Sequence, residues 1–273
     1  MKSKLKVTGE RVFENEYQDT LSGFFIYMMH MASYRFARKF CTDKRVLDFG
    51  CGSGYGSAKI AEIADSVVAV DISQEAIDFA RENYQQENLT FSRIQENSRL
   101  PFKDESFDVV LSFQVIEHIC QDIAYLDEAK RLLRKNGIII IITPDRTGRL
   151  FPFQKPWNRW HVREYALPEL GKLVEKSFNI DCACKMGAPW EAAKIEYLRY
   201  RKIKWLTLPF TMPFIPEKVR IAGLNFLHIL NSSAERTSNK QSFDEEKRSL
   251  TEEIFEIGDQ VENPMNLIIV GRK

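Results

Sequence analysis

The sequence predicts an α/β fold built on a doubly wound, mostly parallel β-sheet. Residues 45–56 read as a buried strand, Val46–Phe49, that runs into a glycine-rich turn and then into a helix beginning near Tyr55. A second apolar strand follows over Val67–Asp71. Strands and helices then alternate to about residue 180, which is the pattern that places parallel strands in one sheet with helices on both faces.

The glycine-rich turn predicts a ligand site. Gly50, Gly52 and Gly54 let the backbone take left-handed angles and approach a ligand closely. The following helix directs its N–H groups and positive dipole end at whatever lies over the turn. A dinucleotide fingerprint would need its third glycine at Tyr55. The turn instead reads D-x-G-x-G-x-G, and the Asp48 carboxylate suits a ligand with an ammonium group better than a pyrophosphate.

The second strand ends in a carboxylate. Asp71 lies about 20 residues beyond the turn, where doubly wound folds place an acidic residue on ribose hydroxyls. The structural alternative is a carboxylate that only caps the next helix. Ser73 is the expected N-cap of that helix, in which Ile77 is an apolar position. A third, short strand is expected over Phe91–Ile94.

Further motifs follow in a fixed order, and with the turn they resemble class I S-adenosylmethionine-dependent methyltransferases. The family pattern "LPF…sFDvV.s" is matched by Leu100–Phe102 with Ser106–Ser112. The pattern "EHI" is matched by Glu117–Ile119. The pattern "RvLkpgG…TPn" is matched by Arg131–Gly137 with Ile138–Pro144. The resemblance covers roughly residues 5–180.

Two N-terminal segments resemble the type of these enzymes associated with bacterial surface-glycan biosynthesis. Thr8–Arg11 matches "TGER", and His30–Ala37 resembles "EH..RY.fA". In the second segment Ser33 stands in place of the arginine and Met29 in place of the glutamate.

The resemblance implies a Rossmann-like sheet of seven strands in the order 3-2-1-4-5-7-6, with the last inserted strand antiparallel. It divides the chain into a helical lid (residues 1–43), a cofactor-binding core (44–186), an insertion covering the acceptor site (187–262) and the final strand of the core sheet (263–273).

The cofactor implied by the resemblance is S-adenosylmethionine. Asp71 would bind the ribose hydroxyls, the glycine backbone would lie under the methionine and ribose, Asp48 would reach the ammonium group, and Glu96 is favoured near the adenine amine. The full set of expected cofactor-binding residues is Asp48, Gly50, Cys51, Gly52, Gly54, Asp71, Ile72, Glu96, Asn97, Ser98 and Gln114.

The expected catalytic residues are His118, His161 and Glu117. An alcohol acceptor loses a proton when it is methylated, and histidine suits this task because its pKa lies near neutral pH. His118 follows the fourth strand, and His161 lies in Trp157–Tyr165, which resembles the family's "NP.HvrEyt" loop. Bracing of these loops is the structural alternative for both histidines. No metal is predicted, although Glu117 and His118 offer two ligands for a divalent cation.

Composition and charge limit the classes of partner and the location that we expect for this protein. The 39 basic and 38 acidic residues give a net charge of +1, which does not recommend nucleic acid. The five scattered cysteines indicate reduced thiols, and no apolar run of 18 residues suggests a membrane span, so we expect a cytoplasmic protein. The expected partner is a small-molecule, glycan or glycolipid acceptor. The oligomeric state is left open.

Residues 194–216 mix basic residues with an apolar, proline-punctuated run. The three prolines in Trp205–Pro216 argue against a regular helix there. The segment would either cover the acceptor pocket or make a peripheral contact with a membrane surface through its basic and aromatic side chains.

Three functions therefore compete. The first is O-methylation of a sugar or glycolipid intermediate of a bacterial surface polysaccharide. The second is O-methylation of a small hydroxylated or quinone-like metabolite. The third, from a different class, is a protein that binds the cofactor without catalysis and serves a partner.

Overall fold

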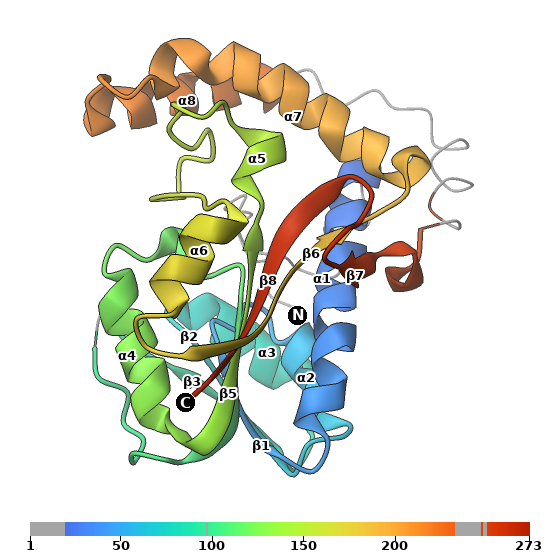
Figure 1. Ribbon diagram of the computed structural model, residues 1–273, viewed down its shortest axis with the longest axis vertical. Helices are drawn as coiled ribbons and strands as arrows, with labels where there is room; N and C mark the ends of the chain where they lie inside the picture. Colours follow the sequence, from blue (N-terminus) through green and yellow to red (C-terminus); the bar gives the residue numbers. More distant parts are fainter. Residues whose placement is uncertain (1–19, 97, 233–246, 248–249) are drawn as a thin grey trace.

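The computed structural model describes residues 20–96, 98–232, 247 and 250–273. Its centre is an eight-stranded sheet in the order β3-β2-β1-β4-β5-β8-β6-β7 (Figure 1). The strands are β1 Arg45–Phe49, β2 Ser66–Asp71, β3 Leu89–Arg93, β4 Phe107–Phe113, β5 Leu133–Pro144, β6 Asn179–Gly187, β7 Glu256–Gly258 and β8 Pro264–Arg272. The helices are α1 Leu21–Cys41, α2 Tyr55–Ala61, α3 Gln74–Asn83, α4 Asp122–Leu132, α5 Arg146–Arg149, α6 Leu167–Val174, α7 Trp190–Thr211 and α8 Glu217–Ser232, with short 3-10 turns η2 Ile116–His118 and η3 Glu252–Ile254.

The strand order confirms the predicted topology. The first five strands are parallel, and β8 lies antiparallel between β5 and β6. Among the described residues the structure adds one strand to the prediction, β7, which pairs with Lys185–Gly187 at the end of β6. This strand has three residues and lies at the edge of the sheet. Three residues are too few to show the alternating apolar pattern by which a strand can be predicted. Strand β5 also begins before Ile138, because Leu133 already pairs with Phe107 across a β-bulge.

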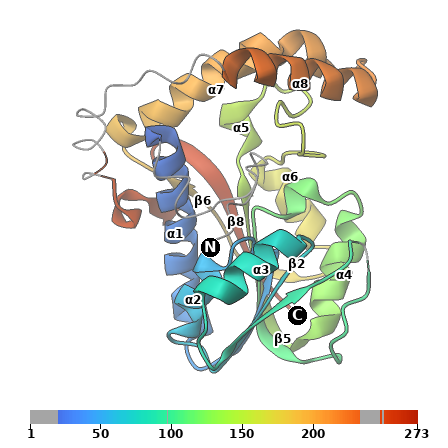
Figure 2. The same ribbon diagram turned by 180° about the vertical axis from the view of Figure 1, so that it is seen from behind.

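Helices cover both faces of the sheet (Figures 1 and 2). Ile138, Ile140 and Ile142 of β5 belong to the core formed with α1, α2 and α3, whereas Ile139 and Ile141 belong to the core formed with α4 and α6. This split follows from the two-residue period of a strand. All five are at most 8% exposed, and burying such a side chain stabilises the fold by roughly 1.5–3 kcal/mol.

The region around Pro209 differs from expectation, since α7 continues through it to Thr211. The prolines act at different points: Pro209 lies within the last turn of α7, whereas Pro213 and Pro216 lie in the turn between α7 and α8. The Gln154 side chain donates to the Lys204 carbonyl at 3.0 Å and to the Thr211 hydroxyl at 2.8 Å. The N–H that Pro209 lacks would have bonded the Trp205 carbonyl, so these bonds anchor the end of α7 to the loop after α5 and do not replace the missing bond.

Helices α7 and α8 lie together beyond the carboxyl edge of the sheet (Figure 1). α7 contacts α1, α5 and α8. Within the described residues no helix is both long and apolar enough to cross a membrane.

Candidate active site

A cavity of about 500 Å³ opens at the carboxyl ends of β1, β2 and β4. The strand order reverses between β1 and β4, and doubly wound sheets bind ligands at such a point. Helix α1 forms one wall, through His30, Ser33 and Tyr34. The remaining lining residues are Phe49, Gly50, Cys51, Gly52, Ser53, Tyr55, Asp71, Ile72, Ile94, Gln95, Glu96, Ser98, Leu100, Phe113, Gln114, Val115, His118, Ile119, Tyr125 and Trp160.

The glycine turn has the backbone geometry that its sequence predicts. The φ angles of Gly50, Gly52 and Gly54 are +106°, +54° and +85°. A Cβ on Gly50 would lie 2.4 Å from a Val115 methyl group, and one on Gly54 would lie 2.7 Å from Phe91. A Cβ on Gly52 would meet no protein atom within 4 Å. Gly50 and Gly54 are therefore required by packing, whereas Gly52 presents open backbone to the cavity.

Asp71 is held in place at the end of β2, on the cavity wall. One carboxylate oxygen accepts from the Gly52 N–H at 3.0 Å and the other from the Ser73 N–H at 2.8 Å. A carboxylate offers about four lone-pair positions, so each oxygen can accept a further bond from a ligand hydroxyl. Ser73 also caps α3 by accepting from the Ala76 N–H, as predicted. These features fit a ribose bearing two hydroxyl groups.

Asp48 lies beneath the glycine turn, outside the set of lining residues. It is 1% exposed, and one of its oxygens accepts from the Ser57 hydroxyl at 2.6 Å and from the Tyr34 hydroxyl at 3.1 Å. Burial raises the pKa of Asp48 to about 6, against the lowering effect of these hydrogen bonds. The residue thus ties β1 to α1 and α2, and its contact with an ammonium group stays a prediction. Gly54 likewise lies outside the cavity wall.

Further residues expected to bind the cofactor lie after β2 and β3, and Glu96 is the one expected near the adenine amine. Ile72, Glu96 and Ser98 line the cavity. Asn97 lies outside the described residues.

Gln114 combines a strained backbone with an unsatisfied donor. Its φ angle is +57°, unusual for a residue other than glycine, and its N–H donates to the Ile142 carbonyl at 2.8 Å. Its side-chain Nε2 is buried, with no hydrogen-bond partner among the described residues. Buried donors are rarely left unpaired, so this amide beside the cavity fits a ligand that carries an acceptor group.

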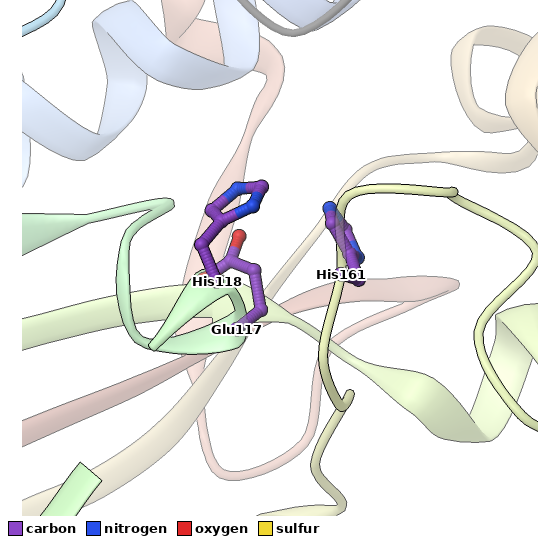
Figure 3. Close-up of side chains that lie close together, drawn as sticks. All are labelled: Glu117, His118 and His161. Atoms are coloured by element: carbon purple, nitrogen blue, oxygen red, sulfur yellow. The ribbon is translucent and has the colours of Figure 1, made fainter. Parts of the chain in front are cut away.

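Glu117, His118 and His161 meet next to the cavity (Figure 3). Glu117 and His118 belong to η2, while His161 lies on the loop that follows α5. The Glu117 carbonyl accepts from the N–H groups of Val162 and Arg163, which holds this loop against η2. The two histidine rings meet edge to face at 4.8 Å. His118 lines the cavity, whereas Glu117 and His161 lie behind it.

His118 has a defined tautomer. Its Nδ1 lies 3.3 Å from the Trp160 carbonyl, which can only accept, so Nδ1 carries the proton and Nε2 is the basic nitrogen. Burial lowers the pKa of His118, so the ring is neutral at pH 7. Beside it, Glu117 is fully buried, and one of its oxygens accepts from the Thr143 hydroxyl at 2.8 Å. Burial raises the pKa of Glu117.

A buried charge network holds His161. Its Nδ1 lies 2.8 Å from a Glu164 oxygen, and Glu164 also accepts two bonds from Arg149, at 2.8 and 3.1 Å. Arg149 packs on the rings of Trp157 and Tyr200. Burial would raise the pKa of Glu164, but Arg149 and His161 lower it to about 2. Since burial lowers the pKa of His161, the neutral ring donates from Nδ1 and directs Nε2 elsewhere.

The same cluster could hold a divalent cation. Glu117, His118 and His161 each offer one ligand atom, and these atoms all lie within 4.8 Å of one another. The second Glu117 oxygen is buried without a partner among the described residues. Imidazole and carboxylate ligands suit several divalent metals. The predicted absence of a metal is therefore open to test.

Sequence reasoning missed much of the wall that α1 and the loops provide. Tyr34, Tyr55 and Trp160 line the cavity, and so does His30, whose role the sequence left open. His30 Nδ1 lies 2.8 Å from the Tyr55 hydroxyl, and burial lowers the pKa of His30 to about 4. Helical spacing of His30 with Ser33 and Tyr34 was the available signal. The described residues of the insertion contribute nothing to the cavity wall, so its covering role stays a prediction. Thr8–Arg11 lies outside the described residues.

Comparison with known proteins shows which proteins the core resembles. Residues 47–141 match a family model described as a methyltransferase domain. The chain is 32% identical over 173 residues to a "Probable S-adenosylmethionine-dependent methyltransferase" of Mycolicibacterium smegmatis, covering 63% of this chain and 65% of that protein. It is 33% identical over 120 residues to a ubiquinone biosynthesis O-methyltransferase of Cereibacter sphaeroides, covering 44% of this chain and 49% of that one. The chain thus spans less than two thirds of these relatives' length.

A solved structure agrees with the fold. The Thermotoga maritima protein described as a "SAM-dependent methyltransferase, possible histamine N-methyltransferase" superposes with a TM-score of 0.55 over 95% of both chains, at 17% identity. Together with the strand order and the glycine turn, these matches show that the core of this chain has the class I methyltransferase fold and that residues 47–141 are similar to methyltransferase domains.

Proposed function

We propose that this protein is an S-adenosylmethionine-dependent methyltransferase that methylates a hydroxyl group of a sugar or glycolipid intermediate in bacterial surface-polysaccharide biosynthesis. The observation that carries the proposal is His118, a neutral histidine on the wall of the cavity that also contains the glycine turn and Asp71. A base and a cofactor cradle in one cavity are what methyl transfer to an alcohol requires.

The cavity residues divide the work of binding. Asp71 accepts from the ribose hydroxyls, and Gly52 lets the ligand lie against its backbone. The Gln114 amide donates to an acceptor group of the ligand. Bound S-adenosylmethionine supplies an electrophilic methyl group on a sulfonium. Tyr34 of α1 and Tyr55 at the start of α2 exclude water from it, and we assign the lid role to α1.

His118 accepts the proton that the acceptor hydroxyl loses. With the Nδ1 proton directed at the Trp160 carbonyl, Nε2 is the nitrogen that takes the proton. The Glu164 carboxylate, which acts to raise the pKa of His118, stabilises the resulting imidazolium. His161, held by Glu164 and Arg149, packs on His118 and keeps its ring in place, so we assign it a positioning role.

The acceptor class rests on two observations. The first is the resemblance of Thr8–Arg11 and Trp157–Tyr165 to enzymes of surface-glycan biosynthesis. The second is Trp160, which lines the cavity and is still 45% exposed. An indole at the rim can pack on the apolar face of a sugar ring that extends beyond the cavity.

A small hydroxylated or quinone-like metabolite is the second candidate. The observation that favours it is the match to the Cereibacter sphaeroides ubiquinone biosynthesis O-methyltransferase, together with the apolar part of the cavity wall, including Phe49, Phe113 and Val115. The third candidate, a cofactor-binding protein without catalysis, predicts tight cofactor binding and no turnover with any acceptor.

Formation of S-adenosylhomocysteine would separate these candidates. The acceptors to compare are nucleotide sugars, lipid-linked glycans and soluble catechols or quinols, each with wild type, His118→Ala and His228→Ala. His228 is an exposed histidine of α8 and serves as the matched control. Turnover of a glycan that His118→Ala abolishes and His228→Ala preserves supports the proposal. Turnover of the soluble aromatic acceptors alone would overturn the glycan assignment.

A further inference from the structure

The hairpin of α7 and α8 lies at one end of the molecule (Figures 1 and 2). Several of its apolar side chains are exposed. Trp205 is 61% exposed, and Phe214, in the turn between the helices, is 75% exposed. Val219 and Phe226 of α8 are 49% and 58% exposed. Single exposed apolar residues are ordinary, but this many within two adjacent elements mark an interaction surface.

Basic residues share the exposed face of α7 with the apolar ones. Leu198, Arg201, Lys202, Trp205 and Pro209 recur at helical spacing and are all exposed. The side of α7 opposite to them is buried. Apolar and cationic side chains on one helix face are typical of helices that lie in the interface of a lipid bilayer.

Basic residues dominate the charge of the hairpin, because Glu191, Glu196 and Glu217 are each paired with one of its basic residues. Residues 197–216 include four basic residues and no acidic residue, although the whole chain carries a net charge of only +1. Arg199 is paired with Glu196. For Arg201, Lys202 and Lys218 there is no ion pair within the described part of the chain. The patch therefore complements an anionic surface.

We infer that the exposed face of the α7–α8 hairpin docks on an anionic lipid surface. Cations attract the headgroups, while Trp205 and Phe214 enter the boundary between headgroups and acyl chains. A second copy of the chain fits less well, because its own cations would face these. The inference goes beyond the proposed function, since it needs neither cofactor nor acceptor.

The docked hairpin would bring the active site to the lipid surface. Arg159 donates to the Asn225 side chain at 2.8 Å, and Arg220 donates to the Pro156 carbonyl at 2.6 Å. These bonds fasten α8 to the loop that carries Trp160 on the cavity wall. An acceptor anchored in the membrane would then be presented near the cavity.

Co-sedimentation of the full chain with lipid vesicles tests the inference. One set of vesicles contains phosphatidylglycerol and phosphatidylcholine, the other phosphatidylcholine alone. Wild type should bind the anionic vesicles, more weakly as salt is raised, and bind the neutral ones poorly. Each cation near an anionic surface contributes about 1 kcal/mol to binding. Reversing two of them in R201E/K202E should therefore weaken binding by roughly 25-fold or more. W205S/F214S should weaken it as well.

The control is K103E/K135E, a matched charge reversal at two exposed lysines near the amino-terminal end of β5. It should bind like wild type, and thermal melting should show all variants folded. Failure of wild type to bind anionic vesicles, or equal binding by R201E/K202E, would overturn the inference. So would sedimentation velocity that shows a dimer dispersed by W205S/F214S, because the occupant would then be a second copy.

Discussion

Replacing Glu164 with glutamine tests the buried network behind the active site. The Glu164 side chain is fully buried, and Arg149, its ion-pair partner, is 8% exposed. Glutamine keeps the shape of the side chain but leaves the Arg149 guanidinium without its anion. Breaking such a buried pair costs about 3–5 kcal/mol. That is a large part of the 5–15 kcal/mol by which proteins of this kind are typically stable.

The pKa shift of Glu164 gives a second value for how much its ion pair stabilises the protein. Burial raises this pKa, but Arg149 and His161 lower it by more than burial raises it, so that it falls from 4.5 to about 2. A carboxyl group whose pKa is depressed by folding stabilises the protein above its unfolded pKa. That contribution is lost as the pH falls through the folded value. The shift corresponds to about 3 kcal/mol at pH 7. The difference between wild type and E164Q should therefore shrink between about pH 4.5 and pH 2.

Urea unfolding followed by circular dichroism measures both effects. The control is E169Q, because Glu169 accepts from Arg146 at 3.1 and 3.2 Å but is 49% exposed. At pH 7 E164Q should lose about 3–5 kcal/mol, and E169Q less than about 1 kcal/mol. Equal urea midpoints for E164Q and wild type would refute the reasoning, as would a difference between them that persists at pH 2.

Four further outcomes follow from the site. His118→Ala should lower kcat by about 100- to 10,000-fold with S-adenosylmethionine affinity unchanged, while His228→Ala stays active. Since burial lowers the pKa of His118, kcat/KM should fall only as the pH drops below 6.5, and an acid limb centred above pH 7 would contradict the assignment. Gly54→Ala should destabilise the protein by about 2–4 kcal/mol, because left-handed backbone strain adds to the overlap with Phe91. Gly52→Ala should cost about 1–2 kcal/mol of stability and mainly weaken cofactor binding. Urea midpoints measure the loss of stability, and calorimetry measures the loss of cofactor affinity. EDTA should leave the methyl-transfer rate unchanged if His118 is the base, whereas a loss restored by Mg²⁺ or Mn²⁺ would show that the cluster holds a cation.

The central part of the fold was predictable because its signals are local. A buried strand, three glycines that need positive φ angles and a helix start are adjacent in sequence, so Gly50 to Tyr55 could be interpreted without tertiary information. Ser73 capping and the strand ending at Asp71 are equally local. The strand order came from the resemblance, since adjacent strands such as β1 and β4 are far apart in the chain.

The parts that could not be predicted depend on long-range packing. Asp48 faces Tyr34 and Ser57 beneath the turn because α1 folds over it, and no local pattern states this. Helix α7 continues past Pro209 to Thr211, and its end accepts two bonds from Gln154, which lies more than 50 residues earlier in the chain. The Arg149–Glu164 pair likewise depends on the path of the loop after α5, which brings the two side chains together in the folded protein.

Calorimetric titration with S-adenosylmethionine and S-adenosylhomocysteine, on wild type and Asp71→Ala, tests the central claim most directly. Asp71 is held at the cavity by Gly52 and Ser73, and its two oxygens are assigned to the ribose. We predict micromolar binding to wild type and a loss of at least tenfold in Asp71→Ala. Removal of a charged hydrogen-bond acceptor costs about 1.5–3 kcal/mol. Absence of binding to wild type, or equal binding by Asp71→Ala, would contradict the account, and a parallel titration with a nicotinamide dinucleotide would show whether the cavity takes that ligand instead.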